Sequence, residues 1–259
     1  MKIVKILLGV IVVLVLIIAA IAISTRLDGE KQFAQYAAIT EQALKGFPLA
    51  PRAVKPEFQR VTSLPLIDIS VASRQGDRLA RVNVLDATMM LCMKMYTMMI
   101  RPSYDYNLPV LSVDFIFLPF GKRVYVMEVI DPARIDDPNK KACYDAMKAQ
   151  HAKIAGLPPG ATREWYKDFL ADVSIHSKAE KKDDEVLLAV YKGYLEAYLA
   201  MAKNAGQLPP ESRSRMKDGL EKYLSTLLGQ GGPAVDVFKK VLGAEGQKEY
   251  LRTVMFGVD

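Results

Sequence analysis

The chain begins with an uninterrupted apolar run. Ile6 to Ile23 contain no charged or strongly polar side chain, and these 18 residues span roughly 27 Å as a helix, enough to cross a bilayer. A cleaved signal peptide is the alternative, since Lys2, Lys5 and the small residues of 20–24 suit one, but its apolar region usually has only about 7 to 15 residues. We therefore expect a retained, single-pass membrane anchor, with the lipid bilayer as a partner through residues 6–23.

Beyond the apolar run, the pattern predicts an amphipathic helix and then a linker. Hydrophobic positions of residues 33–44 recur at helical spacing, and Gly46 is placed to end the helix. The segment that follows carries three prolines and is typical of a connection. The chain is thereby divided into a transmembrane anchor (1–27), a connecting helix with a linker (28–57) and a globular domain (58–259).

The first half of the domain alternates apolar and polar positions, as half-buried strands do. The period of two is clearest from Ile67 to Val71, where Asp68 and Ser70 separate the apolar residues. About five strands are predicted in all, and their short connections indicate an antiparallel meander. The other four segments with this pattern are 80–84, 89–100, 110–118 and 123–130.

After Pro132 the hydrophobic period becomes that of helices. Stripes of apolar residues at helical spacing run through 143–154, 187–201 and 216–227, and a last helix is predicted at 245–256. Strands first and helices afterwards indicate an α+β domain in which helices cover a central antiparallel sheet.

Composition and charge exclude several classes of function. Two Cys and two His in 259 residues are too few for a four-cysteine zinc site, and no phosphate-binding glycine motif or Gly-x-Ser-x-Gly motif is present. The net charge of +6 falls to about +3 when the residues flanking the apolar run are set aside, and no run of five Lys or Arg occurs. No nucleic acid is therefore expected as a partner.

The most unusual residue of the predicted strands is Asp114. Strand alternation places it on the face of Ser112 and Ile116, with Val113 and Phe115 on the other face. Because the isolated burial of a charge is costly, a carboxylate in this setting is paired, protonated or functional. A salt bridge to a neighbouring strand and a solvent-facing side chain are the alternatives to a chemical role.

Three other groups of residues are candidates for ligand contacts. Six of the twelve Met lie in 89–99, Met95 among them, and either pack an adaptable core or form a wall for a large planar apolar ligand. Tyr191 belongs to a helical stripe of tyrosines that is more typical of a core than of a ligand pocket. His176 lies in a less regular stretch, where a functional role and an exposed loop position are both open, whereas His151 falls on an apolar helix face.

Several segments, in order and at similar spacing, resemble those of a known family. Arg101 to Asp114, with its Pro, its Leu-Pro and the following Asp, is similar to the central strands of the ferredoxin-dependent bilin reductases, and Asp114 falls on the Asp of that family. Glu164 to Phe169 resembles a Glu-Trp-Phe-x-Asp-Phe segment of the family, and the end of the chain resembles its closing stretch. The resemblance covers residues 58–257.

The resemblance implies an α/β/α sandwich that binds a linear tetrapyrrole such as biliverdin between the sheet and the C-terminal helices. Such enzymes reduce the tetrapyrrole by single-electron steps, with electrons from reduced ferredoxin or a similar donor and with no cofactor or metal of their own. Asp114 is then the expected proton donor, because desolvation raises the pKa of such a carboxyl group, and His176 is a possible second donor. The expected substrate contacts are Met95, Ser112, Tyr191 and Lys178.

The chain departs from the family pattern where proton transfer is concerned. Some members carry a catalytic His on the strand before the Asp; the corresponding residue here is Met95 or Thr97, and neither donates a proton as His does. Members with an Asn-Asp pair near the penultimate helix have their second proton donor there, whereas this chain has Gly231 and Gly232. A membrane-anchored protein that binds a tetrapyrrole or another apolar ligand without catalysis is therefore the alternative. The side of the membrane is left open, and is cytoplasmic if ferredoxin is the donor.

Overall fold

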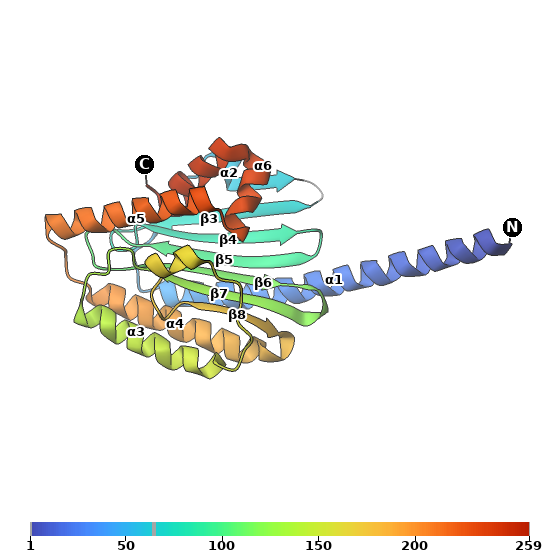
Figure 1. Ribbon diagram of the computed structural model, residues 1–259, viewed down its shortest axis with the longest axis horizontal. Helices are drawn as coiled ribbons and strands as arrows, with labels where there is room; N and C mark the ends of the chain where they lie inside the picture. Colours follow the sequence, from blue (N-terminus) through green and yellow to red (C-terminus); the bar gives the residue numbers. More distant parts are fainter. Residues whose placement is uncertain (1, 64–65, 259) are drawn as a thin grey trace.

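The computed structural model describes residues 2–63 and 66–258 and shows one sheet between two layers of helices (Figure 1). The sheet has the strand order β1-β3-β4-β5-β6-β7-β8, and β2 also pairs with β3. All these pairs are antiparallel, so β3 to β7 form the expected meander. The strands are β1 (Ala50–Pro51), β2 (Arg60–Ser63), β3 (Ile67–Gln75), β4 (Arg81–Met89), β5 (Met93–Arg101), β6 (Val110–Phe117), β7 (Lys122–Ile130) and β8 (Ile175–Glu180).

The hydrophobic pattern of 89–100 predicted one strand, and this prediction is wrong at its first residues. Met89 ends β4, and β5 begins only at Met93. Between them, Met90 and Leu91 turn the chain with φ angles of 49° and 70°, in the left-handed region. The turn carries apolar side chains in place of the Gly and Asn that usually mark one, and the sequence pattern therefore does not show it.

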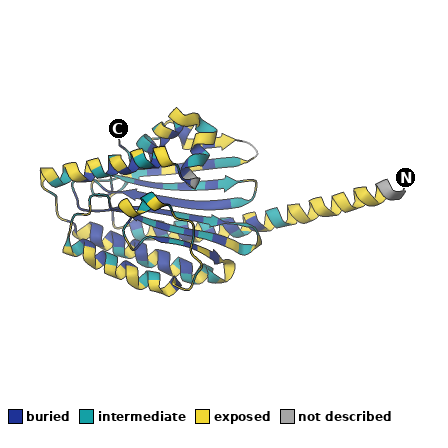
Figure 2. Cartoon of the chain, in the orientation of Figure 1, coloured by how far each residue is buried: buried dark blue, intermediate teal, exposed yellow. Residues whose placement is uncertain are grey.

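The helix α1 (Lys2–Leu44) is one unbroken helix of 43 residues that continues from the apolar run into the domain. Its N-terminal half projects from the domain and is exposed (Figure 2), and in the described part of the chain it is the one helix long and apolar enough to cross a bilayer. The other helices are α2 (Pro56–Gln59), α3 (Pro138–His151), α4 (Asp184–Asn204), α5 (Pro210–Gln230) and α6 (Pro233–Glu249), with the short turns η1 (Pro119–Gly121), η2 (Ala152–Ile154), η3 (Glu164–Asp168) and η4 (Lys181–Asp183) and the π-helical η5 (Tyr250–Phe256).

One face of the sheet is covered by α3, α4 and the C-terminal half of α1. Its centre is a cluster of fully buried rings from α1, β5 and α4, in which Tyr36, Tyr96 and Tyr191 surround the Thr40 hydroxyl. That hydroxyl lies 2.5 Å from the hydroxyls of both Tyr96 and Tyr191. Because burial of each such ring stabilises the fold by about 2 kcal/mol, this face is a closed core.

A buried arginine fixes α1 to the domain. Arg123 of β7 is 3% exposed, and its guanidinium donates to Asp28 of α1 at 2.6 Å and to Asp184 of α4 at 2.8 Å. The side-chain amide of Gln32 in α1 donates to the same Asp184 at 2.9 Å. The C-terminal half of α1 is therefore part of the domain, and Asp28 is the point at which the projecting helix becomes fixed.

The second face of the sheet is covered by α5, α6 and η5, with α2 and η3 at its margins. The C-terminal turn η5 is fixed to the sheet by side chains that donate to its free carbonyl groups. Asn83 of β4 donates to the carbonyls of Val254 and Met255 at 2.9 and 3.0 Å, and Arg101 of β5 donates to that of Phe256 at 2.6 Å. The α/β/α sandwich with a central antiparallel sheet is confirmed.

Candidate functional site

Asp114 lies in the middle of β6, on the face covered by α5, α6 and η5. The strand register sets it in a row across the sheet with Thr97 of β5 on one side and Val126 of β7 on the other. The Thr97 hydroxyl donates to Asp114 Oδ1 at 2.5 Å. No Lys, Arg or His side chain of residues 2–63 and 66–258 forms an ion pair with this carboxyl group, so the salt bridge considered as an alternative is not present.

The surroundings of Asp114 keep its carboxyl group protonated to a higher pH than usual. Burial raises the pKa of Asp114 from 3.8 to about 6, and the negative charge of Glu128 adds to the rise. The Thr97 hydrogen bond, and to a smaller extent His176, lower the pKa of Asp114, but the effect of burial is the largest. Asp114 is therefore a carboxylic acid that gains and loses a proton near neutral pH.

His176 lies in β8 and not in an exposed loop, so the exposed-loop alternative is wrong. Its Nε2 is 2.9 Å from Glu128 Oε1, and its side chain is only 9% exposed. The ring stacks on Tyr166 of η3, with 5.6 Å between centroids and 22° between planes. Because β8 pairs with β7, His176 is opposite Val126, in the same row as Asp114 and two strands away, about 10 Å.

Three of the residues expected to contact a substrate lie on the same face as Asp114. Met95 of β5 is opposite Ile116 and buried, two residues from Thr97. Ser112 of β6 is buried and is opposite both Met99 of β5 and Glu128 of β7. Lys178 of β8 is exposed, two residues from His176. The structure therefore brings these three residues and the two titratable groups to one side of the sheet.

Tyr191 is not part of this site. Its ring belongs to the core under α1 and α4, on the opposite face of the sheet, and its hydroxyl is fully buried beside Thr40 and Tyr96. The helical spacing of the tyrosines identified the face of α4 that is buried, but not which face of the sheet that helix covers. We therefore omit Tyr191 from the substrate contacts.

The two departures from the family pattern have distinct places in the structure. The residue directly opposite Asp114 is Thr97, and Met95 is one row further along the strand, so of these two residues it is Thr97 that contacts the carboxyl group. Gly231 follows α5 with φ of 70°, and a Cβ added there would lie 2.8 Å from Asp236 Oδ1. A side chain at Gly231 is therefore disfavoured both by backbone conformation and by space.

An aromatic wall closes one side of the site, and sequence analysis did not assign it a role in the chemistry. Trp165 and Tyr166 of η3 pack edge to face at 4.5 Å, and Tyr223 of α5 contacts Trp165 and Phe169 at 5.9 and 5.4 Å between centroids. The Trp165 indole N–H is buried without a hydrogen-bond partner in the described part of the chain. The Trp165 ring contacts Tyr166, whose ring in turn stacks on His176.

Glu128 was also missed, because a single Glu in an alternating strand is typical of a solvent-facing position. Its contact with His176 joins residues 48 positions apart in the sequence, so no local sequence pattern indicates it.

In the described residues, no group of three or more His, Cys, Asp or Glu is placed to hold a metal ion.

Comparison with known proteins agrees with this architecture. Residues 37–257 match the sequence profile of the family described as ferredoxin-dependent bilin reductase. Phycoerythrobilin:ferredoxin oxidoreductase of Synechococcus sp. (strain RCC307) is 22% identical over 84% of this chain and 88% of its own length. The same enzyme of Prochlorococcus marinus (strain MIT 9303) is 21% identical over 61% of this chain and 63% of its own length.

A solved structure shares the fold. Phytochromobilin synthase from tomato, in complex with biliverdin, superposes with a TM-score of 0.72 at 15% sequence identity, over 85% of this chain and 81% of the synthase. The family profile extends from the C-terminal half of α1 through all of the central strands to the residue after η5. The chain therefore belongs to the ferredoxin-dependent bilin reductase family.

Proposed function

We propose that this protein reduces a linear tetrapyrrole of the biliverdin type by single-electron steps, with Asp114 as the proton donor. The observation that carries the proposal is the Asp114 carboxyl group, which faces the C-terminal helices with a pKa of about 6. The membership of the chain in a family of ferredoxin-dependent reductases supplies the electron donor, reduced ferredoxin or a similar protein, and no bound cofactor is invoked.

The chemistry requires a proton for each electron. Ferredoxin delivers one electron at a time, and a two-electron reduction of the tetrapyrrole therefore takes two electrons and two protons. Each added electron makes the tetrapyrrole more basic, so an acid with a pKa of about 6 is well matched to protonate it and to be reprotonated from solvent. Because Thr97 donates to Oδ1 of Asp114, the transferable proton is assigned to Oδ2.

Glu128 and His176 are suited to the second proton. The imidazole and carboxylate are in contact, both side chains are largely buried, and Tyr166 holds the ring in one orientation. His176 is separated from Asp114 by about two inter-strand spacings, roughly 10 Å, a distance that an extended tetrapyrrole spans, and Glu128 lies on the strand between them. We assign to this pair the second protonation, with His176 as the donor and Glu128 as its positioning partner.

The remaining contacts divide between the rings and the propionates of the substrate. Met95 and Ser112 flank Asp114 along the sheet, where an adaptable apolar side chain and a small hydroxyl suit a planar ring system. Lys178 is the exposed cation nearest to His176 in β8 and is assigned to a propionate. The free indole N–H of Trp165 supplies a further donor.

The apolar N-terminal half of α1 supports a single-pass anchor, with the domain in the cytoplasm if ferredoxin is the donor. Residues 6–20 make no buried contact, whereas Asp28 is fixed by Arg123. We expect a chain that starts at residue 27 to remain folded and to leave the membrane fraction. If that chain aggregated where the full-length protein is monodisperse in detergent, residues 1–26 would be part of the fold.

A second function is favoured by one specific observation. The strand before Asp114 carries Met95 and Thr97 where some family members have a His, and Gly231 and Gly232 stand where some have a second donor. A protein that binds a tetrapyrrole but does not reduce it would retain the apolar face and lose these groups. The presence of Asp114, with its raised pKa, favours the reductase.

The two functions are distinguished by mixing the full-length protein in detergent with biliverdin, reduced ferredoxin and an electron supply while absorbance spectra are recorded. The reductase consumes the biliverdin band and forms a reduced bilin, whereas the binding protein shifts the band and leaves it. Asp145→Asn, on the opposite face in α3, serves as the matched control for Asp114→Asn. Equal turnover in the Asp114 and Asp145 variants would contradict the role of Asp114.

A further inference from the structure

Outside α1, the large apolar side chains that are more than half exposed gather at one edge of the sheet. Within the described residues they are Leu66, Met90, Leu91 and Phe120, with exposed fractions of 52%, 62%, 57% and 78%. Leu66 precedes β3, Met90 and Leu91 join β4 to β5, and Phe120 joins β6 to β7. Because the strands are antiparallel, these turns all lie at the same end of the strands (Figure 1). We call this end of the sheet the apolar edge.

The backbone at this edge is strained in a way that presents these side chains to the outside. Met90, Leu91 and Phe120 have φ angles of 49°, 70° and 60°, and they are three of the four non-glycine residues with positive φ in the described chain. Glycine adopts this conformation without steric cost, whereas a bulky side chain does not. In water, both the strained backbone and the exposed apolar side chain cost free energy. Contact of these side chains with an apolar partner would offset that cost, so the turns point to such a partner.

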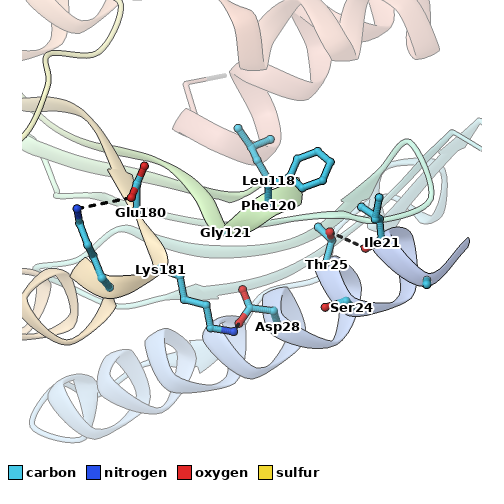
Figure 3. Close-up of a pocket in the computed structure, with 11 residues that line it drawn as sticks. Ile21, Ser24, Thr25, Asp28, Leu118, Phe120, Gly121, Glu180 and Lys181 are labelled. Carbon is cyan, nitrogen blue, oxygen red and sulfur yellow. Dashed lines mark hydrogen bonds and ion pairs between the residues drawn. The ribbon is translucent and has the colours of Figure 1, made fainter. Parts of the chain in front are cut away.

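Helix α1 leaves the domain at this same edge, and the last residues of its apolar run lie beside the turn that contains Phe120. Figure 3 shows a hollow in which Phe120 and Leu118, from the turn after β6, lie beside Ile21 and Thr25 of α1. Phe120 is therefore level with the last turn of the apolar run Ile6–Ile23. If that run crosses a bilayer, Phe120 is at the depth of the membrane interface, where aromatic side chains are favoured.

Charged side chains at this edge fit lipid head groups. Lys181 and Lys182 line the hollow beside Phe120 and are 65% and 75% exposed, and Lys122 is 59% exposed. Their long side chains contact Asp28 and Glu180 and keep their ammonium groups at the surface. Lysines beside an apolar tip are typical of segments that lie in a membrane interface.

We propose that the apolar edge is a second membrane-contact surface. It orients the domain so that this end of the strands faces the bilayer, with Leu66, Met90, Leu91 and Phe120 in the interface. The inference rests on the proposed anchor, because α1 supplies the direction of the membrane, but it does not depend on the reductase activity. It places Asp114, three residues from the end of β6, within roughly 10 Å of the edge that faces the lipid.

A natural cysteine of the chain provides a labelling site on this surface. Cys92 lies in the turn that contains Met90 and Leu91 and is partly exposed, whereas Cys143 is buried and burial raises the pKa of its thiol to about 12. An environment-sensitive fluorophore therefore attaches to Cys92 and not to Cys143 in the folded protein. The full-length protein so labelled is reconstituted into vesicles of phosphatidylcholine and phosphatidylglycerol, with and without lipids that carry a quencher at the top of the acyl chain.

Two matched variants in a Cys92→Ser background complete the experiment. Gln75→Cys places the label at the exposed last residue of β3, at the opposite end of the strands, and Leu14→Cys places it in the apolar run. We expect the Cys92 label to shift its emission to the blue and to lose most of its fluorescence to the quencher, and the Gln75→Cys label to do neither. Phe120→Ser should reduce the quenching at Cys92.

The possible outcomes separate the docking surface from the anchor. Quenching at Leu14→Cys without quenching at Cys92 overturns the docking surface and leaves the anchor intact. Quenching at Cys92 without quenching at Leu14→Cys supports the docking surface and contradicts the anchor. Absence of quenching at both positions overturns both. Cross-linking between Cys92 thiols of two copies, with no lipid quenching, would show that a second copy of the chain covers this edge and would also overturn the proposal.

Discussion

The raised pKa of Asp114 predicts a pH dependence of stability that Asp114→Asn removes. A carboxyl group whose pKa is about 6 in the folded state and 3.8 in the unfolded state binds its proton more tightly when folded. Between these pH values the folded state holds a proton that the unfolded state has lost, so stability falls as pH rises from about 4 to about 6. Below pH 4 both states are protonated, and above pH 7 the full cost of the buried carboxylate is present.

The size of the effect follows from the shift. Each pKa unit corresponds to about 1.4 kcal/mol, so two units set an upper limit of roughly 3 kcal/mol. The side chain of Asp114 is partly exposed, and water reduces the cost of ionisation, so we expect about 1 to 3 kcal/mol. Asparagine keeps the shape of the side chain but does not ionise. The free energy of unfolding of Asp114→Asn, relative to the natural protein, should therefore increase by this amount from pH 4 to pH 8.

The measurement is urea unfolding of the full-length protein in a non-ionic detergent at several pH values, followed by the fluorescence of its single tryptophan. Trp165 lies in the wall of the site and reports its opening. Asp145→Asn is the control: Lys141 lowers the pKa of Asp145, so this carboxylate favours the fold above pH 4 and its removal has the opposite sign. If natural protein and Asp114→Asn showed the same pH dependence, Asp114 would ionise as an ordinary carboxyl group and the assignment of an acid near pH 6 would be wrong.

Three further results are expected. Thr97→Val removes the hydrogen bond that favours the ionised form of Asp114, so the alkaline limb in the pH profile of kcat/KM for bilin reduction should move to higher pH, by up to about one unit; an unchanged profile contradicts the coupling. His176→Gln should slow the second protonation in single-turnover absorbance measurements while leaving the thermal unfolding midpoint within a few degrees, and full activity from pH 5.5 to 8 would exclude its role. Arg123→Met leaves the largely buried Asp184 without a cation and leaves Asp28 with Lys181 alone, so it should cost about 3 kcal/mol in urea unfolding, against less than about 1 kcal/mol for Arg74→Met at an exposed pair.

The sequence predicts the central layers of this fold well, because their signals are local. The alternation around Asp114 and the helical stripes after Pro132 depend only on neighbours along the chain, and the structure confirms the face on which Asp114 lies. The turn at Met90 and Leu91 was not predicted, because its strained residues are apolar and match the strands on either side.

The candidate site was only partly predictable, because its contacts join distant segments. The sequence suggested His176 but not its partner Glu128, which is 48 residues away, nor Thr97 over Met95 as the neighbour of Asp114. A helical stripe shows which side chains share a buried face, but it does not show which face of a sheet the helix covers, and Tyr191 was placed in the site for that reason.

The most direct test of the account is a single-turnover reduction of biliverdin by the full-length protein and by Asp114→Asn, started anaerobically with reduced ferredoxin and followed by absorbance and electron paramagnetic resonance. With Asp114 as the proton donor, the natural protein passes through the one-electron stage to a reduced bilin. Asp114→Asn binds biliverdin with similar affinity, accepts an electron and accumulates a bilin radical, because the proton that completes the step is missing. Formation of the reduced bilin by Asp114→Asn at the rate of the natural protein, without an accumulated radical, would contradict the central role of Asp114.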